Sequence, residues 1–434
     1  MQDKNSKVHE KREDNPSLSP AKPRSFQLMA KPGGPSCNLR CEYCFYTEKE
    51  ALFPDDSKFR MSSEVLEAFV KKFIDASPGP EIQFIWQGGE PALMGIDFYR
   101  KALQLQKKYT TGAKQITNSI QTNGTLLDDP WGSFLAENNF LVGISLDGPR
   151  ELHDLYRRDR GGDSTFDKVM NGLKLLQNHG VQYNVLACVN RESSRHPLDV
   201  YHFLKNEGVE FVQFIPVVER ARDCKAMEQG LAMPPHIGKN EPVLSVTPWS
   251  VESEAFGDFL GSVFDEWVRN DVAKIFVMNF EWILAAWYGI PASNCMYGAQ
   301  CGQCMVIEHN GDIYSCDHYV YPEYRLGNIL NDSPAQLLNK KEQMDFGAAK
   351  EKLLPLECRE CSFIYVCRGQ CPRHRFLKTF DEEEGLNYLC RGLKKYYRHI
   401  SRYMVNMVKL LENGLPVEYI MKAFKGPLFI PLDE

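Results

Sequence analysis

The chain has 434 residues, a length that exceeds one ordinary hydrophobic core and predicts two or more domains. Hydrophobic residues make up 43% of it, as in soluble globular proteins, and no apolar run reaches about 18 residues, so no transmembrane helix is expected. The formal net charge of −6 argues against nucleic acid as the main partner.

The 14 cysteines and the polar N-terminus together indicate the compartment. A secreted chain would use so many cysteines as disulfides, but it would need a signal peptide. Residues 1–24 are polar and charged, without an apolar stretch, and are expected to form a disordered tail. We therefore expect a cytoplasmic protein with reduced thiols, in which clustered cysteines bind metal.

Six apolar runs alternate with amphipathic segments in the first half of the chain, and a polar cluster follows each run. This alternation predicts parallel strands joined by crossover helices. Because the carboxyl ends of such strands meet at one rim, we expect the polar clusters to form one site. Ordinary turns are the alternative, but five clusters at the same end of successive strands favour a site. The predicted strands are residues 25–30, 81–86, 115–120, 140–146, 181–189 and 211–218, and the predicted helices are residues 62–74, 98–109, 131–137, 166–178 and 198–206.

Three cysteines lie in the loop after the first predicted strand, with the spacing Cys37-x3-Cys41-x2-Cys44. A structural zinc site needs four ligands, whereas three thiolates suit a [4Fe–4S] cluster with one iron free to bind a substrate or cofactor. On spacing alone, half of a zinc knuckle or a cluster with a distant fourth cysteine stays open. This spacing, with Tyr43 before the last cysteine, resembles the radical S-adenosylmethionine superfamily, whose free iron chelates S-adenosylmethionine and whose fold is a six-strand partial barrel.

The resemblance implies that the polar clusters hold this cofactor. Gly88-Gly89-Glu90-Pro91 follows the second strand; its glycines allow close approach of the backbone, and Glu90 can accept a hydrogen bond from an ammonium group. In the resembled family this segment binds the methionine amino group. From the residues alone, Arg157 would be interpreted as solvent-exposed, although a guanidinium suits a carboxylate. The matched residues are Tyr43 at the adenine, Ser145 at the ribose or methionine end, Arg157 at the carboxylate and Val218 through its backbone.

A second group of cysteines follows residue 291, where the composition changes. Eight thiolates make two four-ligand sites. Zinc is the alternative, but only Cys358-x2-Cys361 fits a zinc knuckle, and the continuation to Cys367 and Cys371 does not. The eight residues are Cys295, Cys301, Cys316, Cys358, Cys361, Cys367, Cys371 and Cys390.

This second group resembles the SPASM extension of radical S-adenosylmethionine enzymes, which holds two auxiliary [4Fe–4S] clusters. Residues 26–398 resemble the anaerobic sulfatase-maturating enzymes, through segments such as Cys-Asn-Leu-Arg-Cys-Glu-Tyr-Cys-Phe-Tyr, Gln-Gly-Gly-Glu-Pro and Ser-Leu-Asp-Gly-Pro. The resemblance, and not the spacing, implies one cluster on Cys295, Cys301, Cys316 and Cys371 and another on Cys358, Cys361, Cys367 and Cys390. With the first loop, the chain would hold three [4Fe–4S] clusters. Outside these sets, Cys188 is interpreted as a core residue, Cys224 as an incidental thiol and Cys304 as an extra thiol near the first auxiliary site.

Asp317 directly follows Cys316, where a carboxylate beside a negative cluster is unfavourable and therefore suggests a role. A solvated surface aspartate is the alternative from the residues alone, and the adjacent His318 is interpreted as structural. The resembled family assigns the matching aspartate as general base. The resemblance implies that a 5′-deoxyadenosyl radical removes a Cβ hydrogen from a peptide cysteine or serine, that Asp317 takes the thiol or hydroxyl proton, and that an auxiliary cluster accepts the second electron. The product would be Cα-formylglycine.

The expected fold is α/β, a partial (β/α)6 TIM-like barrel with a cysteine-rich C-terminal SPASM domain. Residues 224–247 are expected to form a linker or flexible cover. Helices are predicted at residues 254–267, 276–287, 394–411 and 418–424. The predicted boundaries are a tail at 1–24, the barrel at 25–235, a linker with bridging helices at 236–290, the SPASM domain at 291–395 and C-terminal helices at 396–434.

The implied partners are an unfolded sulfatase polypeptide, or its Cys/Ser-x-Pro-x-Arg segment, and a flavodoxin- or ferredoxin-type reductant; nucleic acid and membrane are not expected. One alternative is another SPASM-type peptide modification, such as a thioether cross-link, but those enzymes often carry an N-terminal recognition domain for which the tail offers no room. A non-enzymatic multi-cluster electron-transfer or zinc protein is the other alternative. It leaves the three-cysteine site and the Gly-Gly-Glu loop unexplained.

Overall fold

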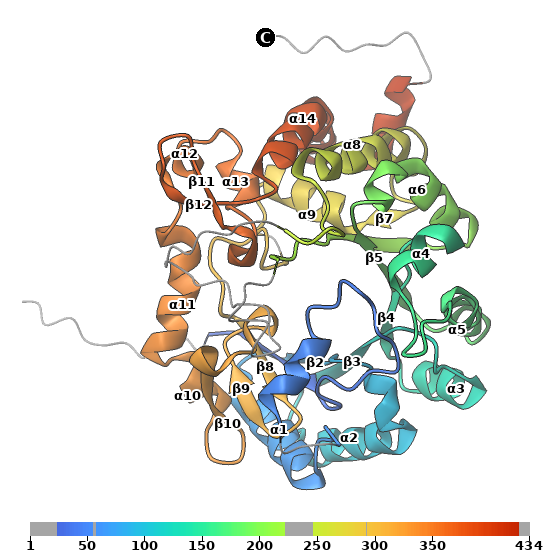
Figure 1. Ribbon diagram of the computed structural model, residues 1–434, viewed down its shortest axis with the longest axis vertical. Helices are drawn as coiled ribbons and strands as arrows, with labels where there is room; N and C mark the ends of the chain where they lie inside the picture. The colour runs from blue at the N-terminus through green and yellow to red at the C-terminus, as the bar shows by residue number, and fades with distance from the viewer. Residues whose placement is uncertain (1–23, 55–57, 222–245, 292, 425–434) are drawn as a thin grey trace, which may run out of the picture.

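The computed structural model describes residues 24–54, 58–221, 246–291 and 293–424. In this part of the chain, six parallel strands lie side by side in chain order and form a curved sheet, so the predicted partial barrel is confirmed (Figure 1). Most predicted strand ends shift by a few residues, as is usual for boundaries. The strands are β1 (Gln27–Lys31), β2 (Glu81–Trp86), β3 (Gln115–Thr122), β4 (Leu141–Ser145), β5 (Tyr183–Val189) and β6 (Phe211–Pro216).

Four further strands extend this sheet to ten within the described residues. The short β7 (Phe276–Val277) pairs with β6, and β8 (Cys304–Glu308) pairs in parallel with β1. Beyond β8, the antiparallel strands β9 (Asp312–Tyr314) and β10 (Arg325–Asn328) complete it. The cysteine-rich half of the chain is therefore joined to the first barrel strand by backbone hydrogen bonds, which the six-strand prediction did not include.

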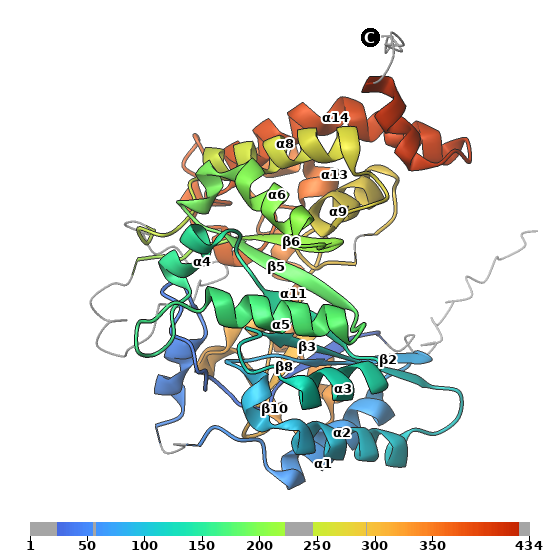
Figure 2. The ribbon, with the colours of Figure 1, turned by 90° about the vertical axis from the view of Figure 1, so that its right-hand side faces the viewer.

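Helices cover the outer side of the curved sheet (Figures 1 and 2). The first shows why they form: the Ser62 side chain caps it by accepting from Val65 N, and its buried apolar residues recur at helical spacing. The short α4 (Arg150–Tyr156) was not predicted. The predicted helices are α1 (Ser63–Ala76), α2 (Ile96–Tyr109), α3 (Asp129–Glu137), α5 (Phe166–Asn178) and α6 (Pro197–Asn206).

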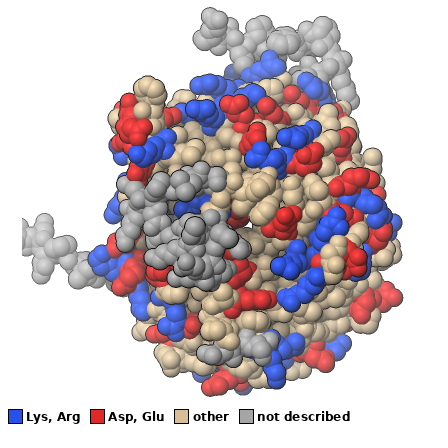
Figure 3. Space-filling view, viewed as in Figure 1, with Lys and Arg blue, Asp and Glu red and all other residues tan. Residues whose placement is uncertain are grey.

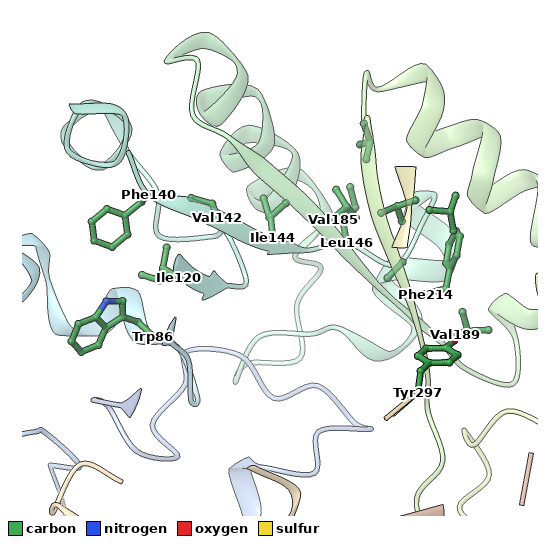
Figure 4. Packing of buried hydrophobic residues seen from close by; sticks show 14 of the residues in the cluster. Trp86, Ile120, Phe140, Val142, Ile144, Leu146, Val185, Val189, Phe214 and Tyr297 are labelled. Atoms are coloured by element: carbon green, nitrogen blue, oxygen red, sulfur yellow. The ribbon is translucent and has the colours of Figure 1, made fainter. Parts of the chain in front are cut away.

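The two faces of the barrel sheet differ in polarity. Apolar strand residues such as Val142, Ile144 and Val185 pack under the helices and form the core (Figure 4). The residues between them point to the inner side and are only half-buried; they include Gln83, Gln121, Ser145, Cys188 and Gln213. Because side chains alternate along a strand, each strand contributes apolar residues to the core on one face and polar residues to a site on the other.

The C-terminal half adds helices above β6. The helices α8 (Ser253–Asn270) and α14 (Cys390–Glu412) lie side by side (Figure 2). Residues 276–287, predicted as one helix, form β7 followed by α9 (Met278–Trp287). The remaining elements are α10 (Pro334–Leu338), α11 (Lys341–Lys352), α12 (Leu356–Arg359), α13 (Ile364–Cys367), β11 (Leu377–Lys378), β12 (Glu384–Leu386) and short 3-10 helices, of which the last is η7 (Val417–Phe424).

Two predictions concern residues that the structure does not describe. Almost all of the predicted N-terminal tail, and the predicted cover at 224–247 except for its last two residues, lie outside the described ranges. None of the helices in the described ranges is both long and apolar enough to cross a membrane.

Candidate active site

The loop after β1 places Cys37, Cys41 and Cys44 together. Two N–H groups point at the first thiol: Leu39 N lies 3.3 Å from Cys37 Sγ, and Asn123 Nδ2 lies 3.8 Å from it. Burial is the main cause that raises the pKa of Cys37 and of Cys41 to about 12, and the negative charge of the neighbouring thiolates adds to it. A metal bound here must therefore replace protons on these thiols.

The Gly-Gly-Glu loop lies directly against the cysteine loop. Gly89 N donates to Gly34 O (2.9 Å), and Glu90 N donates to Ser36 O (2.8 Å). A Cβ on Gly89 would lie 2.0 Å from Ser36 O, which no side chain tolerates. Gly89 is thus required because two backbone segments touch here, and the two loops are positioned as one unit.

Glu90 connects the same loop to the loop after β3. It is fully buried, and it accepts hydrogen bonds from Ala92 N (2.9 Å), Thr122 Oγ1 (2.7 Å) and Asn123 N (2.7 Å). Burial outweighs these donors and raises the pKa of Glu90 to about 6. A carboxylate has about four acceptor positions, so one position of Glu90 is left for the expected ammonium group.

Asp147, which was not among the predicted site residues, is the central acceptor of the site. Its carboxylate accepts from Tyr43 Oη, from Arg157 Nε (2.9 Å) and from Cys188 N (2.9 Å). Arg157 is only 7% exposed, so the solvent-exposed interpretation of this arginine is wrong. The Ser-Leu-Asp-Gly-Pro motif after the fourth strand was the available signal for Asp147, because a carboxylate at a strand's carboxyl end belongs to the shared rim.

The other residues of interest on the barrel strands differ in how deeply they are buried. Ser145 is on the inner face, and its Oγ accepts from Gln121 Nε2 (3.2 Å). Val218 is 2% exposed and packs in the hydrophobic core, so only its backbone is available. Cys188 is half-buried and lies 3.7 Å from Arg157 Nη2, so the interpretation of Cys188 as a core residue is wrong.

Four thiols of the C-terminal half lie near one another, and the charges of three of them act on the buried Lys350. Burial, together with negative charge on neighbouring thiols, raises the pKa of Cys295, Cys301 and Cys316. Lys350 is fully buried and donates to the carbonyl oxygens of Cys295 (2.5 Å), Met296 (2.8 Å) and Gly298 (2.5 Å), which fixes the loop that carries the first thiol. The structure thus groups Cys295, Cys301, Cys316 and Cys371, the set that the resemblance implies.

The other four thiols line a single pocket between α12, α13 and α14. Phe363 N lies 3.5 Å from Cys361 Sγ, and Cys390 is the first residue of α14. The residues brought together here are Cys358, Cys361, Cys367 and Cys390. Cys304 belongs to neither set by sequence; its thiol lies near Cys295 and Asp317, and burial first and then their charges raise its pKa to about 12. Cys224 lies outside the described ranges.

In the described part of the chain, no three His, Cys, Asp or Glu side chains converge closely enough to hold one metal ion. A [4Fe–4S] cube is a different target, because each thiolate binds its own iron. Its ligands surround a cluster-sized space and do not have to meet at one point.

Asp317 follows Cys316 and pairs with the ammonium of Lys31. Burial raises the pKa of Asp317, but the charge and hydrogen bond of Lys31, together with His318 and Arg373, outweigh burial and hold that pKa below its usual value. On the other side, Arg373 pairs with Glu219 and donates to His318 Nδ1 (3.0 Å). The aspartate is therefore not a solvated surface residue, and it carries its negative charge against a buried cation.

A cavity of about 1000 Å³ lies beside the cysteine loop, and Cys41 and Cys44 form part of its wall. Its rim mixes acidic and basic side chains, including Glu42, Glu48 and Arg160. Both signs of charge also alternate over the face of the molecule that Figure 3 shows.

The family comparisons agree with this geometry. Residues 32–204 match the radical SAM superfamily, and residues 295–362 match the iron-sulfur cluster-binding domain SPASM. The fold and its three groups of thiols therefore define a radical S-adenosylmethionine enzyme with a SPASM region. At a finer level, the chain is 44% identical to a serine-type anaerobic sulfatase-maturating enzyme from Bacteroides thetaiotaomicron, over 93% of this chain and 96% of that protein. The chain belongs to the family of anaerobic sulfatase-maturating enzymes.

Other relatives extend the comparison. A cysteine-type enzyme of the same family from Clostridium perfringens is 32% identical over 88% of this chain and 98% of its own. The solved structure described as native anSMEcpe with bound AdoMet has a TM-score of 0.76 and 32% identity, and covers 88% of this chain and 99% of its own. The peptide-bound structure of SuiB from Streptococcus suis has a TM-score of 0.56 at 14% identity, so it supports the fold alone.

Proposed function

We propose that this chain oxidises a cysteine or serine of a sulfatase polypeptide to Cα-formylglycine, with S-adenosylmethionine and three [4Fe–4S] clusters as cofactors. The observation that carries the proposal is the position of Asp317. Its carboxylate follows a thiol of the first auxiliary set, and it pairs with Lys31 on the barrel strand that leads into the first cysteine loop. A base placed between the two halves of the site suits a reaction that removes both a hydrogen atom and a proton from one side chain.

The residues of the first loop fit a cluster with one open iron. Cys37, Cys41 and Cys44 come from one loop, and N–H groups directed at Cys37 Sγ stabilise the negative charge of a bound thiolate. When bound there, S-adenosylmethionine and the reduced cluster supply a carbon-centred radical that can take a hydrogen atom from Cβ. The backbone of Gly88 and Gly89, the free acceptor position of Glu90, and Ser145 are assigned to hold the methionine and ribose ends.

Protein side chains keep the rest of the pocket rigid. Asp147 fixes Tyr43 and Arg157, and Arg157 in turn lies with its guanidinium carbon 5.5 Å from the Tyr43 ring centroid. In the proposed assignment Tyr43 contacts the adenine, Arg157 contacts the methionine carboxylate, and Val218 contributes its backbone. Such pre-positioned groups lower the entropy cost of binding and exclude water from the reacting carbon.

Asp317 acts as the general base on the thiol or hydroxyl of the target residue. The neighbouring Lys31 favours the ionised carboxylate, which is the form that accepts a proton. The first auxiliary set (Cys295, Cys301, Cys316 and Cys371) includes Cys316, which lies next to Asp317 in the chain. A cluster held by these four thiolates would supply the acceptor for the second electron. The other auxiliary set (Cys358, Cys361, Cys367 and Cys390) would pass that electron on to a carrier.

The proposed reaction requires two partners, a peptide substrate and an electron donor. The substrate is a sulfatase segment of the type Cys-x-Pro-x-Arg or Ser-x-Pro-x-Arg, presented before that protein folds. Each turnover begins with one electron from outside, for which we propose a flavodoxin- or ferredoxin-type donor. Relatives of both the serine type and the cysteine type match the chain, so both target residues are tested.

The test is anaerobic incubation of the reconstituted protein with S-adenosylmethionine, dithionite and either peptide, analysed by mass spectrometry for the aldehyde. We expect aldehyde from at least one peptide and none from a matched peptide with alanine at the target position. The Asp317→Asn variant should still make 5′-deoxyadenosine and keep its iron, while aldehyde formation falls about 100-fold or more, the usual contribution of a general base. If wild-type protein cleaves the cofactor but converts neither peptide, the proposed function is wrong.

A further inference from the structure

Lys31 is a buried cation that lies outside both the three-cysteine motif and the Gly-Gly-Glu motif. It is the last residue of β1 and is 1% exposed. Leu28 and Ala30 pack under the helices, so by alternation Lys31 shares the inner face of the strand with Met29. An ammonium group is costly to bury without a partner, so its position in this polar interior requires an explanation from its contacts.

Two contacts link Lys31 to the two halves of the site. Its Nζ pairs with Asp317, which follows the auxiliary ligand Cys316. The same Nζ lies 3.9 Å from the ring centroid of Tyr46, two residues after Cys44. Its stem is also close to the cofactor loop, because a Cβ on Gly88 would lie 3.4 Å from Lys31 Cβ. One side chain thus touches the segment that would carry the first cluster, the cofactor loop and the proposed base.

Other charged groups near Asp317 have partners of their own, although Arg373 and His318 also help to lower the pKa of Asp317. Arg373 pairs with Glu219 and donates to His318 Nδ1 (3.0 Å), and its guanidinium carbon lies 4.5 Å from the Phe45 ring centroid. Glu308 accepts from Tyr46 Oη (2.5 Å) and faces the far end of that tyrosine. Within the described ranges, Lys31 is the basic side chain that forms an ion pair with Asp317.

We infer that Lys31 is a positioning residue for the reaction: its ammonium holds the Asp317 carboxylate in place beside the first-cluster loop, so that hydrogen-atom removal and proton removal act on the same target residue. This inference rests on the proposed function and assigns a residue to it. Without Lys31, the carboxylate loses its fixed partner while the cysteines, the Gly-Gly-Glu loop and Asp147 remain intact. Cofactor cleavage should then continue without productive oxidation.

The experiment compares Lys31→Met, which keeps the unbranched stem without the charge, with Lys31→Arg, which keeps the charge. For Lys31→Met we expect the ratio of aldehyde to 5′-deoxyadenosine to fall about 100-fold, the size of effect that a misplaced reacting group produces. Peptide KM and iron per chain should stay within about threefold of wild type, since the lysine touches neither the thiols nor, in this assignment, the peptide. Lys31→Arg should recover a large part of the lost coupling.

A double-mutant comparison separates positioning from support of the fold. If Lys31 acts through Asp317, the double variant Lys31→Met/Asp317→Asn should be no worse in aldehyde formation than Asp317→Asn alone. Parallel loss of iron, cofactor cleavage and aldehyde in both Lys31→Met and Lys31→Arg would overturn the inference, as would unchanged coupling in Lys31→Met. Because wild type and Asp317→Asn are measured in the same series, a failure of the proposed function appears as no aldehyde from wild type and is distinguishable from a failure of this assignment.

Discussion

A few buried carboxylates in the site each accept several hydrogen bonds, and some of them balance the buried positive charge nearby. Asp147 is the clearest case: its side chain is fully buried, and its partner Arg157 has a side chain that is 8% exposed. A buried ion pair of this kind contributes little beyond a matched apolar pair, but removing one partner leaves the other charge uncompensated. The site is therefore sensitive to single substitutions at these carboxylates.

Asp147→Asn should lower the free energy of unfolding by about 3 kcal/mol, because Arg157 keeps its charge without a buried counter-ion. Anaerobic thermal unfolding of the reconstituted protein measures this as a lowered midpoint. The matched control is Asp167→Asn, which removes an exposed pair with Arg150 and should leave the midpoint unchanged. Equal effects of the two substitutions would contradict the role given to burial.

The raised pKa of Glu90 predicts how the stability of the folded protein changes with pH. Its pKa rises from 4.5 to about 6 in the folded protein, so folding favours the protonated form. The stabilisation from this proton is complete below pH 4.5 and is lost as the pH rises through 6. Relative to Glu90→Gln, wild type should lose about 1–2 kcal/mol of stability between pH 5 and pH 7, with no further change above. Denaturation midpoints of both proteins across this range provide the measurement, and parallel curves would be the contrary result.

Some residues of the candidate site could be predicted from the sequence, and others could not. The three thiols of the first loop were predictable from their spacing in one short motif, whereas the division of the C-terminal thiols into two sets came from the resemblance alone. The partners of Asp147 and Lys31 were not predictable, because they lie far away along the chain: Tyr43 is 104 positions from Asp147. No local pattern encodes such pairs, and only the folded sheet brings them together.

At the scale of elements, the contact between α8 and α14 controls where the second auxiliary set lies. A Cβ on Gly257 would lie 2.2 Å from Gly392 O, and one on Gly392 would lie 1.7 Å from Ser253 O. Both glycines are needed because the helix backbones touch. Since α14 begins at Cys390, the position of this contact also fixes one ligand of that set.

Gly257→Ala should push α14 away from α8 and destabilise the protein by about 1–3 kcal/mol, the usual cost of overpacking. Iron per chain should fall together with the thermal midpoint, because Cys390 moves with the helix. The control lies one turn further along α8: a Cβ on Gly261 would meet its nearest atom at 3.6 Å, an ordinary contact. Gly261→Ala should keep its iron and gain about 0.5–1 kcal/mol from helix propensity. The same loss of iron in both variants would show that the glycine contact is not the cause.

At the scale of the whole molecule, one continuous sheet joins the barrel to the cysteine-rich half. The alternation of strands and helices predicted the six parallel strands, because crossover connections follow from the sequence pattern. The pairing of β8 with β1 was not predictable, since these strands are separated by most of the chain and either could have formed an edge. This pairing, with the Lys31–Asp317 ion pair beyond it, brings the loop of the first cluster and the proposed base to one place.

The central claim is that this combined site cleaves S-adenosylmethionine and removes a hydrogen atom from the Cβ of a sulfatase residue. The most direct measurement uses a peptide with deuterium at Cβ of the target cysteine or serine and follows the label by mass spectrometry. We predict that aldehyde and 5′-deoxyadenosine form together and that the 5′-deoxyadenosine carries the deuterium. Aldehyde formed alongside unlabelled 5′-deoxyadenosine would contradict the account.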